Sequence, residues 1–286
     1  MTGHSPLRLG LIGIGIGQSA APRLHRLAGG HYRIDIDYPL FDLADGGDFD
    51  ACLRACADRR GVNVTHPFKT RAIELVETVA PEIARLGAIN TVLFDDGRPV
   101  RGANTDHSGF IAAYRAAFAE RSPGRVALFG AGGVGRPLAA ALIALGAEAI
   151  QVYDPDRARA ETLAAALGHT SCPIVVAKTP AAAATDAAGL VNATPLGMHN
   201  HPGSPLPAGA FRAPRWAFDA VYTPVDTVFL GHAATAGAVV MSGYRLFLWQ
   251  GIHAFELFTG QRIDLATLTR LLAPTAAAVR ALWRAG

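Results

Sequence analysis

The chain has 286 residues, which is long enough for about two domains and excludes a single small module held together by disulfides. Half of its residues are hydrophobic and 17% are charged, a composition that buries a substantial core and excludes disorder as the main character of the chain. The 26 Lys and Arg residues exceed the 23 Asp and Glu residues by only 3, and no run of basic residues could follow a phosphate backbone, so no nucleic-acid partner is expected.

Short apolar stretches alternate with helical segments in the first part of the chain. The strands predicted there are Leu7–Ile14, Tyr32–Phe41, Gly61–Thr65, Ala88–Phe94 and Val100–Gly102, and the helices are Ala21–Ala28, Phe49–Arg60 and Arg71–Val79. Pro22 suits the first turn of a helix, and Asp95-Asp96-Gly97 suits a hairpin turn. The apolar start imitates a secretory signal, but its glycines disfavour a helix, so we interpret it as a buried strand that ends in a loop.

A helix predicted over Gly109–Glu120 and a break at Ser122-Pro123-Gly124 precede a second alternation of strands and helices. Its strands are Arg125–Phe129, Ala149–Tyr153, Ile174–Ala177, Gly189–Ala193, Trp216–Val221 and Ala238–Met241, and its helices are Pro137–Leu145, Arg157–Leu167 and Pro180–Ala188. Helices over Phe247–Phe258 and Leu265–Trp283 follow. The sequence therefore predicts an α/β fold with a first domain over 1–108, a doubly wound parallel-sheet domain over 109–244, and C-terminal helices within 245–286 that pack back on the first domain.

The cysteine pattern favours a reducing compartment, and we expect a cytoplasmic protein. Cys52 and Cys56 share one helix face, Cys172 stands alone, and no Cys or His completes a four-ligand zinc spacing. His199-Asn200-His201 lacks a third ligand and is interpreted as a pair of exposed loop histidines, so no metal site is predicted. No apolar run reaches the length that a membrane-spanning helix needs.

The sharpest local motif is the glycine-rich turn Gly130-Ala131-Gly132-Gly133-Val134-Gly135, which follows a predicted strand and opens a predicted helix. Glycines at these positions permit a tight turn and a close backbone approach to a pyrophosphate, which sits on the amide groups of the helix N-terminus. This context predicts a dinucleotide site. A packing turn without a ligand is the alternative.

Asp154 ends the next strand, near the spacing at which an acidic residue binds the adenosine ribose. A carboxylate there accepts a hydrogen bond from a 2′-hydroxyl and repels a 2′-phosphate, which favours NAD over NADP. Two alternatives stay open at this stage. Asp154 could cap the following helix, and Arg157 or Arg159 could bind the phosphate of NADP.

Three polar strings at predicted strand ends or loops of the first domain could handle the proton that accompanies hydride transfer. They are Asn63-Val64-Thr65-His66-Pro67-Phe68-Lys69, Asn90-Thr91 and Asn104-Thr105-Asp106. Taken singly, each could be no more than a turn or a solvated surface. Their joint occurrence with a cofactor turn predicts an active site.

Together these strings resemble the shikimate dehydrogenase family, including its quinate/shikimate dehydrogenase branch. The resemblance runs nearly end to end, through Gly10–Gly13, Ser19–His25, Asn63–Lys69, Gly87–Thr91, Gly102–Asp106, Gly130–Gly135, Asn192–Met198, Asp219–Pro224 and Gly243–Gly260. It implies an N-terminal substrate domain, a Rossmann-type cofactor domain with the active site in the cleft between them, and the reversible oxidation of a ring hydroxyl, as in the conversion of shikimate to 3-dehydroshikimate.

By this resemblance Lys69 and Asp106 are the catalytic pair. Lys69 would take the hydroxyl proton if a partly buried site keeps its amine neutral, or would polarise the ketone as an ammonium, while Asp106 orients the hydroxyl. His66 is the rival base, because imidazole exchanges protons near neutral pH. If His66 lies on a strand, three positions from Lys69, it faces elsewhere.

The resemblance also implies binding residues. Substrate positions are Ser19, Ala21, Asn63, Thr65, Asn90, Tyr222 and Gln250, and cofactor positions beyond the glycine turn are Thr194, Pro195, Met198, Ala220 and Gly243. Asp154 and Arg159 join the cofactor positions on the spacing and charge given above. Packing or turn formation is the alternative for each. The implied ligands are a hydroxylated cyclic carboxylic acid and NAD, with NADP as the second choice, and the implied assembly is a monomer or homodimer.

One position departs from the family pattern. The family has a hydroxyl residue just before the proline, serine in shikimate dehydrogenases and often threonine in the quinate-accepting branch, whereas this chain has Ala21 before Pro22. A hydrogen bond to a charged group contributes roughly 1.5–3 kcal/mol, so its loss weakens carboxylate capture unless another group compensates. The departure bears on the identity of the acid and not on the type of reaction.

Three functions remain from the sequence. The first is NAD-dependent oxidation of shikimate, with quinate as a further substrate. The second is a dehydrogenase of the same fold for a modified shikimate, such as an amino-substituted one, or the NADP-dependent biosynthetic enzyme. The third is a non-catalytic nicotinamide-dinucleotide sensor, which would have no chemical need for both Lys69 and Asp106.

Overall fold

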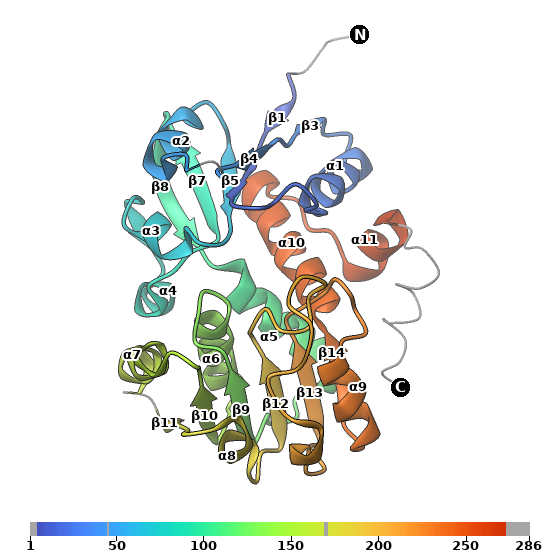
Figure 1. Ribbon diagram of the computed structural model, residues 1–286. Coiled ribbons are helices and arrows are strands. Elements are labelled where there is room, and N and C mark those ends of the chain that lie inside the picture. Colours follow the sequence, from blue (N-terminus) through green and yellow to red (C-terminus); the bar gives the residue numbers. More distant parts are fainter. Residues whose placement is uncertain (1–4, 45, 169–170, 273–286) are drawn as a thin grey trace. The chain divides into compact units, whose positions relative to one another are not determined.

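In the computed structural model, which describes residues 5–44, 46–168 and 171–272, the chain forms two compact units (Figure 1). The first unit holds the described residues up to Thr105 together with residues 248–272, and the second holds Asp106–Phe247. The division falls a few residues before the predicted position after 108. Each unit has its own six-stranded sheet. No helix among the described residues has both the length and the apolar character needed to cross a membrane.

The first unit contains a mixed sheet in the order β4-β2-β5-β7-β8-β6 and a separate parallel pair, β1 and β3. Its strands are β1 (Leu7–Arg8), β2 (Leu11–Gly13), β3 (Ile36–Asp37), β4 (Leu40–Asp42), β5 (Gly61–Val64), β6 (Thr78–Val79), β7 (Thr91–Asp95) and β8 (Arg98–Ala103). Its helices are α1 (Ala21–His31), α2 (Phe49–Ala55), α3 (Lys69–Ile73), α4 (Pro81–Leu86), the later part of α10 (Gly243–Thr259) and α11 (Leu265–Leu272).

Two predicted strands of this unit are each split. The stretch predicted as Leu7–Ile14 forms β1 and β2, and the stretch predicted as Tyr32–Phe41 forms β3 and β4. The breaks fall around Gly10 and Pro39. Pro39 has no amide hydrogen to donate to a ladder, and a Cβ on Gly10 would lie 2.7 Å from the Phe41 ring, so the chain passes tightly here. The expected buried strand near the N-terminus is confirmed as β2.

The helix predicted over Arg71–Val79 is wrong after Ile73. Helix α3 ends at Ile73, and β6 pairs with β8 at the edge of the sheet, where the Thr78 hydroxyl donates to the Val100 carbonyl at 2.8 Å. Helix α4 was missed, and helix α2 ends at Ala55, five residues before the predicted Arg60. Here β-branched residues in a short edge strand mimic helical spacing. The hairpin turn is confirmed, because Asp96 and Gly97 both have positive φ between β7 and β8.

The aromatic core of the first unit includes the C-terminal part of α10. His25 on α1 stacks on Tyr38 with a centroid distance of 4.8 Å and also contacts Phe255 and Phe258 of α10. Helix α11 packs on α1, where Arg23 donates to the Leu272 carbonyl at 2.6 Å. These contacts place the described C-terminal helices on the first unit, while residues 273–286 of the predicted segment lie outside the described part of the chain.

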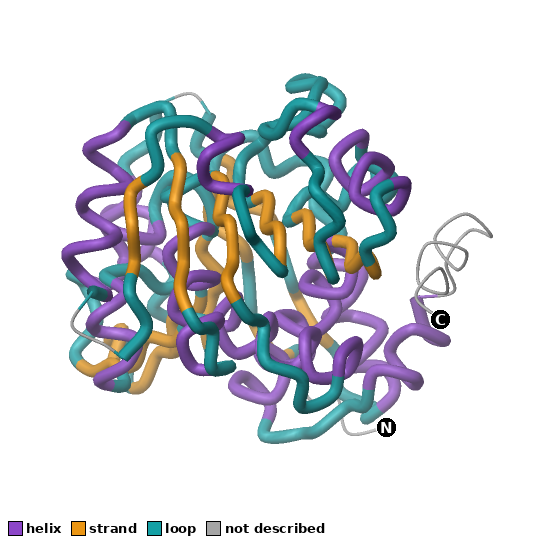
Figure 2. The backbone as a smooth tube through the Cα atoms, turned by 90° about the horizontal axis from the view of Figure 1, so that it is seen from below, coloured by secondary structure: helices purple, strands orange, loops and turns teal. Residues whose placement is uncertain are grey.

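The second unit contains a wholly parallel sheet in the order β11-β10-β9-β12-β13-β14 (Figure 1). Figure 2 shows strands in orange lying side by side, with helices in purple around them. The strands are β9 (Arg125–Phe129), β10 (Ala149–Tyr153), β11 (Ile174–Val176), β12 (Gly189–Asn192), β13 (Trp216–Asp219) and β14 (Val239–Ser242). The helices are α5 (Thr105–Phe118), α6 (Gly135–Ala144), α7 (Arg157–Leu167), α8 (Pro180–Ala184), the short 3-10 helix η1 (Ala208–Ala210) and α9 (Val228–Thr235).

Helices cover both faces of this sheet. On one face α8 and α9 bury an apolar cluster that includes Phe129 and Phe229. On the other face α5 packs Phe110 edge-on against Phe218 at 5.0 Å. The order of strands and the two covered faces confirm the predicted doubly wound α/β fold.

Candidate functional site

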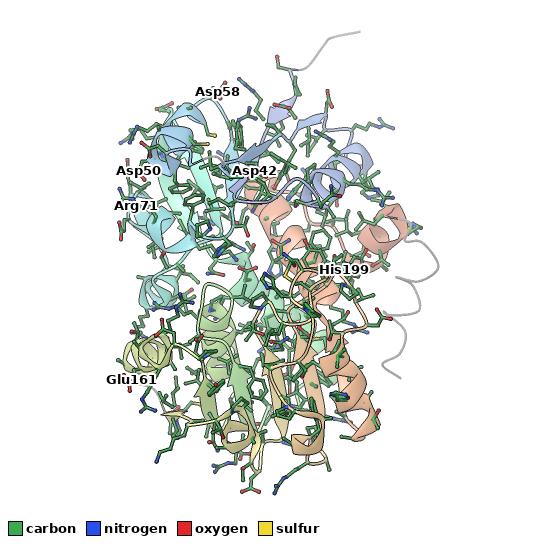
Figure 3. All side chains as sticks on the ribbon, in the orientation of Figure 1. Asp42, Asp50, Asp58, Arg71, Glu161 and His199 are labelled. Carbon is green, nitrogen blue, oxygen red and sulfur yellow. The ribbon has the colours of Figure 1, made fainter. Side chains whose placement is uncertain are left out.

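The loop after β2 carries two of the predicted substrate residues, Ser19 and Ala21. The Asp42 carboxylate at the end of β4 holds this loop, since it accepts from the backbone N–H groups of Gly15 at 2.9 Å and Ile16 at 3.0 Å (Figure 3). The Ser19 hydroxyl oxygen accepts from the Ala21 N–H at 3.3 Å, at the first residue of α1. Both residues are half-buried. The loop thus presents a hydroxyl and the start of a helix at one edge of the first sheet.

The segment after β5 holds the predicted base and its rival. Strand β5 ends at Val64, and the cis peptide bond between His66 and Pro67 turns the chain into α3, which begins at Lys69. His66 therefore lies in an exposed turn, and its predicted position on a strand is wrong. Lys69 is 9% exposed, while Thr65 is half-buried.

A buried chain of hydrogen bonds, which we call the first network, joins Tyr38, Asn63, Thr91, Asn90 and Thr105. The Asn63 Oδ1 accepts from the Tyr38 hydroxyl at 2.7 Å, and its Nδ2 donates to the Thr91 Oγ1 at 3.0 Å. The Asn90 Oδ1 in turn accepts from the Thr91 hydroxyl at 3.1 Å and from the Thr105 backbone N–H at 2.7 Å. The amide of Asn63 is thus engaged within the protein.

The first network fixes the orientation of the Asn90 side chain. A backbone N–H can only donate, so the amide oxygen of Asn90 must face Thr105, and the Thr105 hydroxyl adds a second bond to the same oxygen at 3.1 Å. The Nδ2 group is then the donor side of this amide. Asn90 is 4% exposed.

Backbone contacts bring the predicted residues of this unit together. The Ile89 N–H donates to the Lys69 carbonyl at 2.9 Å, which sets Asn90 next to the start of α3. Asp106 follows Thr105 directly in the first turn of α5 and is 8% exposed. Lys69, Asn90 and Thr105 are therefore gathered at one place, as the motifs predict, and Asp106 is the next residue along the chain.

His25 extends the first network and was not predicted from the sequence. Complete burial lowers the pKa of His25 to about 3, an effect that its hydrogen bond with Asn63 partly opposes. Burial also raises the pKa of the Tyr38 hydroxyl. The Nδ1 atom of His25 is buried without a hydrogen-bond partner. A histidine in a helical pattern is usually an ordinary face residue, so no sequence signal marks this position.

The glycine-rich turn has the backbone geometry that a dinucleotide needs. Gly130 has a φ of +98°, and a Cβ there would lie 2.9 Å from the Ala193 carbonyl group. A Cβ on Gly135, the first residue of α6, would collide with the Gly130 carbonyl oxygen. By contrast, a Cβ on Gly132 would meet no heavy atom within 4 Å. The turn is tight where it packs and open at Gly132, beside the partly exposed Gly133 and Val134.

Asp154 at the end of β10 is tied to this turn. One carboxylate oxygen accepts from the Ala131 N–H at 2.8 Å, and the other accepts from the Asp156 N–H at 2.9 Å. Asp156, not Asp154, caps α7, so the capping alternative for Asp154 is wrong. Arg159 pairs with Asp156 at 3.2 Å, and Arg157 pairs with Glu161 at 2.8 Å.

A second buried hydrogen-bond network, which we call the second network, joins Asn192, Thr194, Asp219 and Thr227. Asp219 is fully buried and accepts from Asn192 Nδ2 at 2.9 Å and Thr227 Oγ1 at 2.6 Å. Burial raises the pKa of Asp219 to about 6, although its hydrogen bonds act in the opposite direction. Of the four, only Thr194 was a predicted site residue. The sequence offered a signal for the two residues but not for their pairing, since Asn192 and Asp219 are polar residues within apolar predicted strands.

The remaining predicted residues are placed as follows. Pro195 and Met198 are exposed in the loop after β12, and Met198 is 40% exposed. A Cβ on Gly243, the first residue of α10, would collide with the Ala220 carbonyl. The Tyr222 ring stacks on Phe247 at 5.3 Å. Gln250 is half-buried on the part of α10 that belongs to the first unit, whereas Tyr222 belongs to the second unit.

These features define a two-unit α/β protein in which one unit has the doubly wound sheet and glycine turn of dinucleotide-binding enzymes. The family model for the shikimate dehydrogenase substrate binding domain matches residues 11–92. The shikimate dehydrogenase (NADP(+)) of Streptomyces avermitilis is 40% identical over 270 residues, covering 90% of this chain and 91% of the relative. The chain belongs to the shikimate dehydrogenase family.

Both cofactor types occur among the relatives. The quinate/shikimate dehydrogenase (NAD(+)) of Corynebacterium efficiens is 36% identical over 274 residues, covering 91% of this chain and 95% of the relative. Among solved structures, the quinate dehydrogenase from Corynebacterium glutamicum in complex with NAD matches with a TM-score of 0.86 and 33% identity, covering 94% of this chain and 99% of that one. The predicted family is therefore confirmed.

Proposed function

We propose that this protein catalyses the reversible NAD-dependent oxidation of a ring hydroxyl of shikimate, giving 3-dehydroshikimate, and that it also accepts quinate. The observation that carries the proposal is the gathering of Lys69, Asn90 and Thr105, with Asp106 next in the chain, in a protein that is 36–40% identical to shikimate and quinate dehydrogenases over nine-tenths of its length. A packing role alone does not require a lysine that is only 9% exposed.

Lys69 and Asp106 share the proton chemistry in this proposal. When bound, the nicotinamide ring supplies the hydride acceptor. Lys69 takes the proton of the ring hydroxyl while the hydride leaves the carbon that bears this hydroxyl, and in the reverse direction Lys69 returns a proton to the ketone oxygen. Asp106 accepts a hydrogen bond from the hydroxyl and orients it, and the Asn90 Nδ2 donates to a neighbouring ring oxygen.

The second unit fits the cofactor. Open backbone at Gly132, beside the start of α6, suits the pyrophosphate, and the Asp154 carboxylate beside the turn suits a ribose with free hydroxyls. Each Asp154 oxygen keeps acceptor capacity beyond its single backbone bond, whereas its charge repels a 2′-phosphate. Arg157 and Arg159 are each paired with a carboxylate of their own segment, which supports NAD over NADP.

The test follows the absorbance of the reduced nicotinamide with NAD and with NADP, while shikimate, quinate and an amino-substituted shikimate are offered in turn. We expect turnover with NAD and shikimate or quinate. Turnover with NADP alone would refute the role of Asp154. Binding of a dinucleotide without turnover of any ring acid would instead support the non-catalytic sensor. Turnover of the amino-substituted acid alone would support the second hypothesis, which Ala21 motivates.

The three described cysteines are free thiols, which supports a cytoplasmic location within this proposal. The proposed oligomeric state is a monomer or a homodimer. Light scattering of the purified protein tests the assembly, and a higher oligomer would contradict it.

A further inference from the structure

The buried carboxylate of Asp219 has a more elaborate set of partners than a core residue needs. Its Oδ1 accepts from Asn192 Nδ2 and from the Val221 N–H, both at 2.9 Å, and its Oδ2 accepts from the Thr227 hydroxyl at 2.6 Å. A carboxylate that is 0% exposed costs free energy to bury, and neutral hydrogen-bond donors offset this cost. The arrangement therefore holds fixed the elements that supply those donors.

Through Asn192, Asp219 clamps the loop that follows β12. Asn192 Nδ2 donates to the Leu196 carbonyl at 2.9 Å, and its Oδ1 accepts from the Thr194 N–H at 2.9 Å and from the Thr194 hydroxyl at 2.6 Å. All the hydrogen-bonding atoms of the Asn192 amide are thus committed between Asp219 and residues 194–196. The position of this loop follows from the position of the carboxylate.

Through Thr227, the same carboxylate fixes the start of α9. The Thr227 Oγ1 donates to Asp219 and accepts from the Leu230 N–H at 3.3 Å, so one hydroxyl both caps the helix and binds the acid. Gly197 lies against both residues, since a Cβ there would be 3.3 Å from Thr227 and 3.8 Å from the Asp219 Oδ2. Thr227, Gly197 and Asp219 therefore form one packed cluster.

This cluster lies at the carboxyl ends of β12 and β13, the end of the sheet at which a dinucleotide binds in doubly wound folds. Strands β9 and β12 are neighbours, and the chain leaves β9 toward β10 on the other side, so the strand order reverses between them. The glycine turn follows β9 and the Thr194 loop follows β12. The two are in direct contact, because Gly130 lies against the carbonyl group of Ala193. The second network thus fixes the loop beside the glycine turn.

We propose that Asp219 and Thr227 are positioning residues for the dinucleotide, which they affect through the Thr194–Leu196 loop and without touching the cofactor themselves. The proposal rests on the proposed function for the identity of the cofactor. It predicts that loss of the bond between Thr227 and Asp219 weakens dinucleotide binding, while the binding of the ring acid, most of whose predicted residues lie in the first unit, keeps its affinity.

The matched pair Thr227→Val and Thr227→Ser tests this. Valine has the shape of threonine but cannot donate to Asp219, whereas serine keeps the hydroxyl. We expect Thr227→Val to raise the Kd for NAD roughly tenfold, as loss of a charge-assisted hydrogen bond does, and to leave the KM for the ring acid unchanged. The Kd for NAD of Thr227→Ser should stay within about twofold of the wild-type value. Calorimetric titration of NAD below the unfolding transition, checked by circular dichroism, measures the Kd.

A purely structural role gives a different result. Thr227→Val would then lower the Tm but leave the Kd for NAD of the folded protein unchanged, and this outcome overturns the proposal. Equal weakening of NAD and ring acid also overturns it. Asp219→Asn provides a second variant with the same expected split. NAD titration needs no turnover, so a wild type that binds NAD but oxidises no ring acid would refute the proposed function and leave this test intact.

Discussion

Each of the two units contains one of the two buried networks, and the networks are built from different chemistry. The first network is neutral throughout, because its members are amides, hydroxyls and a histidine whose pKa burial lowers to about 3. The second network is centred on a carboxylate whose pKa burial raises to about 6. Both end at loops that carry predicted site residues. A neutral network fixes geometry with little dependence on charge, whereas the second depends on the protonation of Asp219.

The largest expected effect is that of Lys69→Ala, which tests whether the proton chemistry belongs to the residues around the first network. If the chemistry belongs to residues gathered by the first network, removal of the amine should lower kcat about thousandfold, within the range that general acid–base groups contribute. The Kd for NAD should stay unchanged, because the glycine turn lies in the other unit. Steady-state kinetics and NAD titration measure the two quantities. A kcat within tenfold of the wild type would remove Lys69 from the mechanism.

The neutrality of the first network can be tested through His25. Its folded pKa of about 3 lies below the ordinary value of 6.5, so the unfolded chain binds more protons and stability falls as the pH drops below 6.5. This group alone should cost about 2.5 kcal/mol between pH 7 and pH 4.5. Urea unfolding of His25→Phe should show a correspondingly flatter pH dependence.

The exposed His199 offers a matched control for that measurement (Figure 3). The variant His199→Gln removes an imidazole that is already exposed, so a change in the pH dependence of the unfolding free energy that only His25→Phe shows is due to the buried position. If His25→Phe and the wild type lose stability equally between pH 7 and pH 4.5, the histidine is not buried in neutral form, and the contrast between the networks fails.

Asp219 should give the opposite sign in the same pH window. Its folded pKa of about 6 exceeds the ordinary aspartate value of 3.8, so the folded chain binds more protons and this group favours the fold at acid pH. The contribution should decline by about 2 kcal/mol as the pH rises from 4.5 to 7. The variant Asp219→Asn cannot titrate there and should lack this decline. An identical pH slope for the variant and the wild type, measured by urea unfolding, would contradict the assignment.

Local patterns predicted what depends on neighbouring residues. The glycine turn, the strands of the second unit and the Asp96-Gly97 hairpin follow from turn chemistry and from apolar runs that are short and well bounded. The sequence did not predict that the first strands are split, nor did it predict the edge strand β6. Strand β6 gains its stability from pairing with β8, more than twenty residues away.

The site residues divide in the same way. Motif resemblance found Lys69, Asn90 and Asp106, whose types are tied to chemistry. It did not find the roles of His25, Asp219 or Thr227, because each acts through partners distant in sequence, such as Asn192, which lies 27 residues from Asp219. Periodicity carries no information on such pairings. Only the register of β12 with β13 brings Asn192 beside Asp219.

The smallest expected effect concerns Ala21, the first residue of α1 in the first unit. Its N–H donates to the Ser19 hydroxyl at 3.3 Å at the start of α1, so a serine at position 21 would place a second hydroxyl beside the first. If the substrate carboxylate binds there, Ala21→Ser should lower the KM for shikimate up to about tenfold. The substitution removes no bond of the first network, so kcat should remain within about twofold. Ala21→Gly, which adds no hydroxyl, is the control, and a KM that serine does not lower would separate position 21 from carboxylate recognition.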